Sequence, residues 1–224
     1  MVYMHSNILT DVTDILLDID GVLLDLSFDK KFWEELVPQE VSSIKNIPID
    51  EAMRDVLGAS KALYGTLPWY ELSYWEQKYG VNLIDVAREN SMYAKFLPGA
   101  EATLKKISAS NKRIIFLTNC DSRLLKVKAN QVPFMQYADE WLSAVDIGVV
   151  KEEQGFWKSA FNKFNIIPEN SIFVDDNIAV VNSALKAGIK KSINVTMPSG
   201  DLSVQNQSEA KLSFKNIEEL FRAI

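Results

Sequence analysis

Short runs of apolar residues, each followed at once by a polar residue, recur along the chain. Three of them stand out: Ile15–Leu17 before Asp18, Ile114–Leu117 before Thr118, and Ile172–Val174 before Asp175. Unbroken apolar runs of this length are typical of parallel strands that are covered on both faces. Weaker strand patterns occupy residues 141–145 and 192–195. We therefore expect a sheet of buried parallel strands.

Segments with helical spacing lie between these runs. Their apolar residues recur every three or four positions: Ala100, Leu104 and Ile107; Trp157, Ala160, Phe161 and Phe164; Ile178, Val181 and Leu185. Gly188 follows the last set and favours a helix end. Strands that alternate with helices predict an α/β fold with a doubly wound parallel sheet, a Rossmann-like core.

Residues 25–97 interrupt this alternation, because they contain helical patterns and no convincing strand. The helical spacing is clearest in two sets: Phe28, Phe32 and Leu36; Leu72, Trp75 and Tyr79. We predict a core domain of residues 1–24 and 98–224, with residues 25–97 inserted as a helical cap. Near the end, residues 198–208 are read as a polar surface loop. A last amphipathic helix is expected to bury Ile217, Leu220, Phe221 and Ile224.

The net charge of the chain and its single histidine and cysteine argue against several classes of function. The 224 residues carry a formal charge of -6 and no basic run, which argues against a nucleic-acid polymer or an anionic membrane as partner. Neither a secretory leader nor a membrane-spanning apolar stretch is evident, so we expect a cytoplasmic protein. His5 is the only histidine and Cys120 the only cysteine. A Ser-His-Asp triad, a histidine-rich zinc site and an internal disulfide are therefore disfavoured.

Candidate chemistry gathers where the predicted strands end. Parallel strands present their carboxyl ends at one edge of the sheet, where ligands bind. The polar residues placed there are Asp18, Asp20, Thr118, Asn119, Asp175 and Asp176, with Lys151 in a following loop. Paired acids suit Mg²⁺, and a hydroxyl beside an ammonium suits phosphate. Taken singly, each residue also has an ordinary explanation as a solvated side chain or a helix cap. The ordered set carries the prediction.

The order Asp18-Ile19-Asp20-Gly21, Thr118, Lys151, Asp175-Asp176 resembles the haloacid dehalogenase superfamily of aspartate-dependent phosphohydrolases. The resemblance extends from about residue 12 to residue 196 and includes a helical cap of the C1 type, inserted directly after the first motif. One departure is Glu152, because many relatives follow the lysine with proline. Residues 16–29, 32–33, 69–70 and 74–75 are similar to bacterial purine 5'-nucleotidases of the GMP/IMP type.

This resemblance implies a Mg²⁺-dependent phosphomonoesterase that works through an aspartyl phosphate. Asp18 is expected to be the nucleophile and Asp20 the general acid and base. Mg²⁺ is expected at Asp18, the main-chain carbonyl of Asp20 and Asp176, with Asp175 orienting a bound water. The non-bridging phosphoryl oxygens are assigned to Thr118, Asn119 and Lys151. The expected substrate is a small phosphorylated metabolite, with GMP or IMP favoured.

The helical insertion is expected to choose the leaving group. Trp33, Tyr70 and Tyr74 are candidates for contact with a base, because Tyr70 and Tyr74 are spaced i, i+4 opposite the Leu72 and Tyr79 face. The alternative is that these aromatic side chains only pack the cap. Cys120 follows a predicted strand, but no imidazole is near in sequence to activate it.

Other activities remain open at the level of sequence. A sugar-phosphate phosphatase or a phosphomutase would use the same core residues. A dehalogenase is disfavoured, because such relatives lack the full acid set and need no metal. A phosphoryl-accepting receiver domain is the non-enzymatic alternative; the order of its motifs and the inserted cap disfavour it. Oligomeric state is left open.

Overall fold

The computed structural model describes residues 8–200 and 212–222 of the chain, and within them it contains one sheet of six parallel strands. The strand order is β3-β2-β1-β4-β5-β6. The strands are β1 Asp14–Leu17, β2 Arg113–Thr118, β3 Glu140–Ser143, β4 Ser171–Asp175, β5 Lys191–Val195 and β6 Ser213–Phe214. The predicted α/β class is confirmed. Sequence reasoning missed β6, because a strand of two residues has too few positions to show a pattern.

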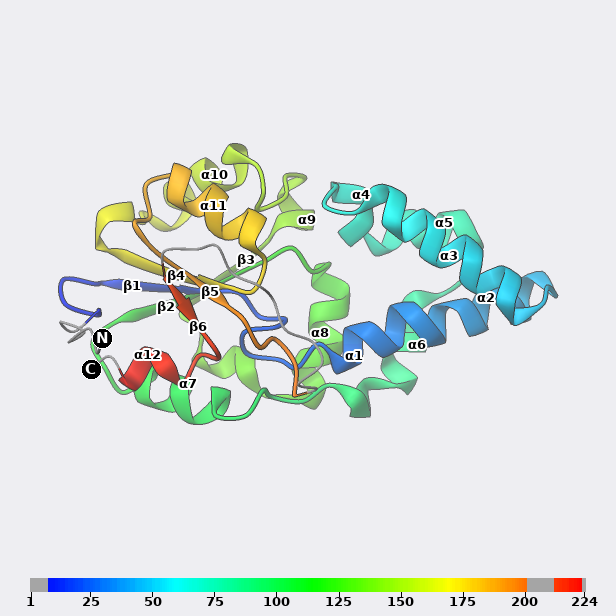
Figure 1. Cartoon of the computed structure of the whole chain (residues 1–224), viewed down its shortest axis with the longest axis horizontal. Coiled ribbons are helices and arrows are strands. Elements are labelled where there is room, and N and C mark those ends of the chain that lie inside the picture. The colour runs from blue at the N-terminus through cyan, green and yellow to red at the C-terminus, as the bar shows by residue number, and fades with distance from the viewer. Residues whose placement is uncertain (1–7, 201–211, 223–224) are drawn as a thin grey trace.

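Helices cover both faces of this sheet (Figure 1). They are α7 Ala100–Ser108, α8 Ser122–Gln131, α9 Ala144–Ile147, α10 Gln154–Phe164, α11 Ile178–Lys186 and α12 Glu219–Arg222. In Figure 1, α10 and α11 lie over one face, and α7 and α12 lie over the other. Among the described helices, none has both the length and the apolar character that crossing a membrane requires.

The two faces of β1 show why its apolar run is unbroken. Leu16 packs in a cluster with Trp157 and Phe173, under α10 and α11. Its neighbours Ile15 and Leu17 point to the opposite face and join a second cluster. Successive side chains of a strand alternate between the faces, so a strand covered on both sides favours apolar residues at consecutive positions. The same packing explains the runs in β2 and β4.

The insertion between β1 and α7 is helical and extends to one side of the sheet (Figure 1). Its helices are α1 Ser27–Lys31, a π-helical turn Phe32–Leu36, α2 Val37–Lys45, α3 Ile49–Leu63, α4 Leu67–Tyr70, α5 Leu72–Tyr79 and α6 Leu83–Glu89, followed by a 3-10 turn Ser91–Tyr93. The entering and leaving segments are hydrogen-bonded to each other. The N–H of Leu97 donates to the carbonyl of Leu23 at 2.8 Å, and that of Asp25 to Lys95 at 3.0 Å. The insertion therefore begins and ends at one place on the core.

Several predictions concern positions at the two ends of the chain. Ile217 and Leu220 are buried, as predicted, although α12 itself spans only Glu219–Arg222. The side chain of Phe221, the residue Ile224 and the residue His5 lie outside what the structure describes. Most of the predicted surface loop at 198–208 also lies outside it, from residue 201 onwards.

Candidate active site

The turn after β1 presents two acids at the edge of the sheet. The N–H of Asp18 donates to the carbonyl of Val174 at 2.9 Å, so pairing with β4 continues one residue past β1. Gly21 then adopts φ +82°, a conformation that only glycine adopts without strain. A Cβ at Gly21 would also lie 2.6 Å from Cγ of Asp176. Glycine is therefore needed both for the sharp turn and for the approach of the second acidic motif.

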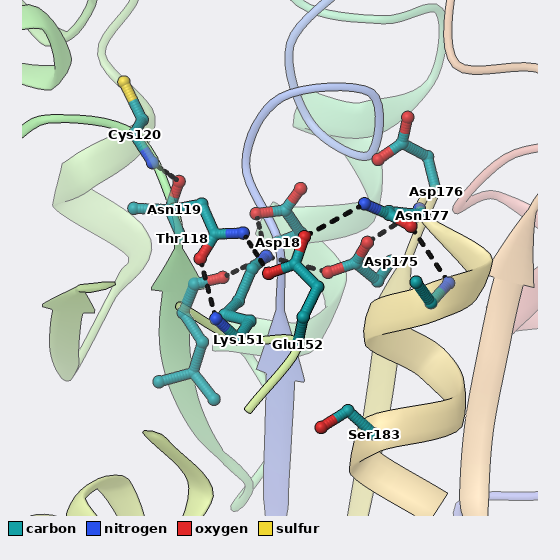
Figure 2. Close-up of polar contacts among 12 residues, drawn as sticks. Asp18, Thr118, Asn119, Cys120, Lys151, Glu152, Asp175, Asp176, Asn177 and Ser183 are labelled. Atoms are coloured by element: carbon teal, nitrogen blue, oxygen red, sulfur yellow. Dashed lines mark hydrogen bonds and ion pairs between the residues drawn. The ribbon is translucent and has the colours of Figure 1, made fainter. Parts of the chain in front are cut away.

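Lys151 joins two of the acids, although they lie on different strands. Its Nζ donates to Oδ1 of Asp18 and to Oδ2 of Asp175, both at 2.7 Å, and to the carbonyl of Leu117 at 3.1 Å (Figure 2). The Lys151 side chain is only 2% exposed. Ion pairs removed from water in this way are held by several hydrogen bonds at once, which fixes their geometry. The structure thus brings together residues separated by up to 157 positions in the sequence.

Negative charge outweighs positive charge in this cluster. Asp18, Asp175 and Asp176 each offer an oxygen within 4.8 Å of the others, and the ammonium of Lys151 is paired with the first two. Burial raises the pKa of Asp18 to about 8, against the opposing effect of Lys151. Burial also raises the pKa of Asp175 and of Asp176. A hard divalent cation would remove this excess charge, so the donor set fits such an ion.

The two acids of the second pair differ in their surroundings. Both oxygens of Asp175 are engaged: Oδ2 by Lys151, and Oδ1 by the N–H of Asn177 at 2.8 Å. Asp176, by contrast, lines the cavity described below, and Asp175 does not. The residue that caps the N-terminus of α11 is Asn177. The acid pair therefore does not serve as the cap of this helix, which was its ordinary alternative role.

The end of β2 supplies the residues predicted to bind phosphate. Thr118 lines the cavity, and its Oγ1 accepts a hydrogen bond from the N–H of Cys120 at 3.0 Å. The side chain of Asn119 accepts from the N–H of Lys151 and donates to Glu152, both at 2.9 Å. These bonds give the Asn119 side chain a role in tying two loops together. Burial raises the pKa of the Cys120 thiol, which keeps it protonated.

Glu152, the residue after Lys151, connects the core with the insertion. Its Oε1 accepts a hydrogen bond from the hydroxyl of Tyr70 at 2.9 Å, while Asn119 bonds its other oxygen. Burial raises the pKa of Tyr70, and the charge of Glu152 raises it further. Glu152 thus makes a direct contact between the two parts of the chain.

Sequence reasoning missed a second buried lysine, on α8. The Nζ of Lys128 lies 2.8 Å from Oδ1 of Asp20, and 2.6 and 2.9 Å from the two oxygens of Asp29. Its side chain is only 1% exposed. A signal was present, because Leu124 and Lys128 are spaced i, i+4 and both are buried. A lysine on the apolar face of a helix needs buried partners of opposite charge.

A cavity of about 490 Å³ lies between the polar residues of the core and the insertion. Its core side contains Asp18, Asp20, Thr118, Asn119, Lys151 and Asp176. The aromatic residues among those that line it are Trp33, Tyr64, Trp69 and Tyr70. Cavities of this size hold small ligands, and here charged groups face aromatic ones.

Tyr74 does not belong to the lining of this cavity, in contrast to Trp33 and Tyr70. Its ring packs edge-on against Trp75 at 5.3 Å. The expectation that Tyr70 and Tyr74 share a face assumed one continuous helix. Glu71, with ψ 110°, instead separates α4 from α5, so the i, i+4 relation does not hold. Leu72, Trp75 and Tyr79 are buried, as predicted for the inner face of the insertion.

The fold and site define a class of enzyme, and sequence comparison agrees. A model of the haloacid dehalogenase-like hydrolases matches residues 15–188. The chain belongs to this family, and it is an enzyme, a phosphatase of the haloacid dehalogenase type. The resemblance predicted from the ordered motifs is confirmed.

Comparison with individual proteins shows which members of the family resemble the chain. It is 33% identical to the GMP/IMP nucleotidase YrfG of Escherichia coli K12, over 94% of this chain and 96% of that protein. A solved phosphatase from Thermococcus onnurineus has a TM-score of 0.80 at 17% identity, covering 94% of this chain and 97% of that one. L-2-haloacid dehalogenase from Xanthobacter autotrophicus, at 14% identity, has a TM-score of 0.62, with 94% and 97% covered. Because phosphatases and dehalogenases share this fold, the site residues must decide the chemistry.

Proposed function

We propose that this protein is a Mg²⁺-dependent phosphomonoester hydrolase that removes the phosphate of purine nucleoside 5'-monophosphates, GMP or IMP, through an aspartyl phosphate on Asp18. The observation that carries the proposal is the cluster of Asp18, Asp175 and Asp176 with Lys151, next to the cavity. We call the core side of the cavity the floor (Asp18, Asp20, Thr118, Asn119, Lys151 and Asp176) and its aromatic side the roof (Trp33, Tyr64, Trp69 and Tyr70). The nucleotidase name of a relative 33% identical to the chain supports the substrate.

Asp18 is suited to be the nucleophile because it is held in place and faces the cavity. Its Oδ1 is bonded to Lys151, which leaves Oδ2 for attack on phosphorus. The attack forms the O–P bond to Asp18 and breaks the bond between phosphorus and the 5'-oxygen of the nucleoside. The charge that develops on the phosphoryl oxygens requires fixed positive groups and donors. Lys151 and Thr118 supply an ammonium and a hydroxyl at this place.

Asp20 lines the same cavity and is assigned the proton transfers. As an acid, it gives its proton to the departing 5'-oxygen. As a carboxylate, it then takes a proton from the water that attacks the aspartyl phosphate, releasing inorganic phosphate and restoring Asp18.

Mg²⁺ would be held by the Asp18 and Asp176 carboxylates and the main-chain carbonyl of Asp20. When bound, it supplies positive charge that neutralises the phosphoryl oxygens. Asp176 is preferred to Asp175 as a direct ligand because it lines the cavity, whereas both oxygens of Asp175 are already bonded within the protein. Asp175 is left to fix Lys151 and the metal's surroundings.

Recognition of the base is assigned to the aromatic roof, with Trp33 and Tyr70 as the residues that contact it. Stacking a base on an aromatic ring contributes about 1 to 3 kcal/mol, which corresponds to roughly a 10- to 100-fold preference over a substrate without a base. A sugar phosphate lacks this contact. The cavity of about 490 Å³ has a size suited to a mononucleotide.

Phosphate release from GMP, IMP, AMP and ribose 5-phosphate, with Mg²⁺ or with chelator, tests the proposal. We expect Mg²⁺-dependent release, fastest from GMP or IMP, and none from Asp18→Asn, whose amide is a poor nucleophile. Asp146→Asn is the matched control, because this acid is exposed on α9. Full turnover in Asp18→Asn or in chelator would contradict the mechanism. Equal kcat/KM for GMP and ribose 5-phosphate would contradict only the choice of substrate.

A further inference from the structure

Lys128, which is buried, forms an ion cluster with the partly exposed Asp20 and Asp29, and the hydrolytic mechanism does not account for this cluster. Its ammonium lies between Oδ1 of Asp20 and the two oxygens of Asp29, at 2.6 to 2.9 Å. Asp20 and Asp29 both line the cavity, whereas Lys128 does not. A substrate in the cavity would therefore meet the two carboxylates and not the lysine. Any effect of Lys128 on the reaction must pass through its partners.

The cluster determines which oxygen of Asp20 is available. Among the described residues, the partner of the Asp20 carboxylate is Lys128, and the bond is made to Oδ1. That bond leaves Oδ2 to reach a group in the cavity. Without it, a short side chain on the turn before Gly21 could rotate about χ1 and χ2. Proton transfer to a leaving group depends on hydrogen-bond distance, so a lost orientation lowers the rate directly.

Asp29 balances the lysine and brings the insertion into the cluster. It belongs to α1, the first helix after the chain leaves the core, whereas Lys128 belongs to α8 of the core. Both carboxylates lie within 2.9 Å of the same ammonium, so the two acids are close enough to repel each other. The lysine between them offsets this repulsion. The orientation of the Asp20 side chain thus depends on a contact with the first helix of the insertion.

We propose that Lys128 is a positioning residue that, together with Asp29, holds the Asp20 carboxylate with Oδ2 directed to the leaving-group oxygen. This inference rests on the proposed role of Asp20 as the general acid. A purely structural role for the cluster is the alternative. It predicts that loss of Lys128 lowers stability and slows all substrates equally.

Substrates with different leaving groups distinguish a positioning role of Lys128 from a purely structural one. An alkoxide leaving group such as that of GMP needs a proton, whereas nitrophenolate leaves readily without one. With enzyme in excess and saturating Mg²⁺, we expect Lys128→Met to slow guanosine release from GMP by about 10²-fold or more. Nitrophenolate release from 4-nitrophenyl phosphate is expected to slow by less than about tenfold, a fraction of that effect. Lys128→Arg keeps the charge and should recover most of the rate.

Three further variants complete the test. In an Asp20→Asn background, Lys128→Met should cause no additional loss, because a residue that acts through Asp20 has nothing left to position. Lys126→Met is the matched control, since Lys126 is exposed on the same helix, and it should leave both rates unchanged. If circular dichroism shows that Lys128→Met does not fold, Asp29→Asn replaces it. This variant removes one partner of Lys128 and should show the same dependence on leaving group at smaller size.

Three outcomes would overturn the inference: equal slowing of both substrates, losses that add to those of Asp20→Asn, or wild-type rates in Lys128→Met. Failure of the proposed function looks different. In that case the wild-type protein would release neither product, or Asp18→Asn would remain active, whatever the residue at position 128. If the panel selects another alkyl phosphate over GMP, that compound takes the place of GMP in the same comparison.

Discussion

The floor and the roof of the cavity are built in opposite ways. The floor consists of buried and half-buried polar residues, mostly at the ends of parallel strands, and Lys151 joins acids from two strands by ion pairs of 2.7 Å. The roof consists of aromatic residues from separate elements of the insertion: Trp33 in the π-helical turn, the exposed Tyr64 at the end of α3, and Trp69 and Tyr70 on α4. Adjacent strands lie about 4.8 Å apart, so residues at their ends meet whatever their distance in sequence. No comparable fixed spacing determines which side chains meet when they lie on the helices of an insertion.

This difference in construction corresponds to two roles: contact with the phosphoryl group and choice of the substrate. Groups on the floor can contact a phosphoryl group, which is the same in every phosphomonoester. Groups on the roof can contact only the rest of the substrate, which varies. Changes to the floor should therefore alter rate or metal use alike for nucleotides and sugar phosphates, which both have an alkoxide leaving group. Changes to the roof should alter the choice among substrates.

Removing the ammonium from the floor should have the largest effect. Lys151→Met leaves Asp18 and Asp175 without their partner and removes positive charge from the phosphoryl site. We expect kcat to fall about 10²- to 10³-fold for nucleotide and sugar phosphate alike. Steady-state kinetics with both substrates measures this. Lys158→Met, exposed on α10, is the control. A loss confined to nucleotides would break the division between floor and roof.

The two acids after β4 should differ in their effect on metal use. Asp176→Asn is expected to raise the Mg²⁺ concentration needed for half-maximal activity about 10- to 100-fold. Asp175→Asn should act mainly through Lys151, lowering kcat and thermal stability, because both of its oxygens are bonded within the protein. Mg²⁺ titration of both variants makes the comparison. Identical titration curves for Asp176→Asn and wild type would refute the assignment of Asp176 as a ligand.

A change to the roof should affect selectivity alone. Trp33→Leu is expected to reduce the ratio of kcat/KM between GMP and ribose 5-phosphate about tenfold, the lower end of what base stacking contributes. Turnover of ribose 5-phosphate should stay near the wild-type value. Tyr74→Leu is the matched control, because it removes an aromatic ring of the insertion that does not line the cavity. Should both variants change the ratio equally, packing of the insertion and not contact with the base would be responsible.

The excess charge of the floor should make Mg²⁺ stabilise the protein more at high pH. In the folded protein the pKa of Asp18 is raised to about 8, above its ordinary value of 3.8. The metal-free folded state therefore holds more protons than the unfolded chain between these values, so this group's contribution to stability is lost as the pH rises through that range. Mg²⁺ competes with those protons.

We expect the rise in Tm on adding Mg²⁺ to be larger at about pH 8.5 than at about pH 5.5. Tenfold tighter apparent binding, about 1.4 kcal/mol, corresponds to roughly 3–6 °C for a chain of this size. Thermal denaturation with and without Mg²⁺ at each pH measures it. Asp176→Asn should diminish the difference, and a larger rise at the lower pH would contradict the charge argument.

Much of the floor could be predicted from the sequence alone. The inner positions of the three central strands are apolar on both faces, so their ends are visible where an apolar run meets a polar residue, as at Asp18, Thr118 and Asp175. Topology then places these ends together. The sequence by itself therefore determined the fold class, the acid and lysine set, and the family to which the chain belongs.

Other features depended on contacts between segments that carry no shared pattern. The break at Glu71 separates Tyr74 from the residues that line the cavity, and contacts between α1 and α8 pair Asp29 with Lys128. A side chain's partner across a tertiary contact is set by packing and charge balance, which local spacing does not encode. The tertiary structure alone decided which aromatic residues face the cavity and which lysine holds Asp20, because both depend on how the insertion packs on the core.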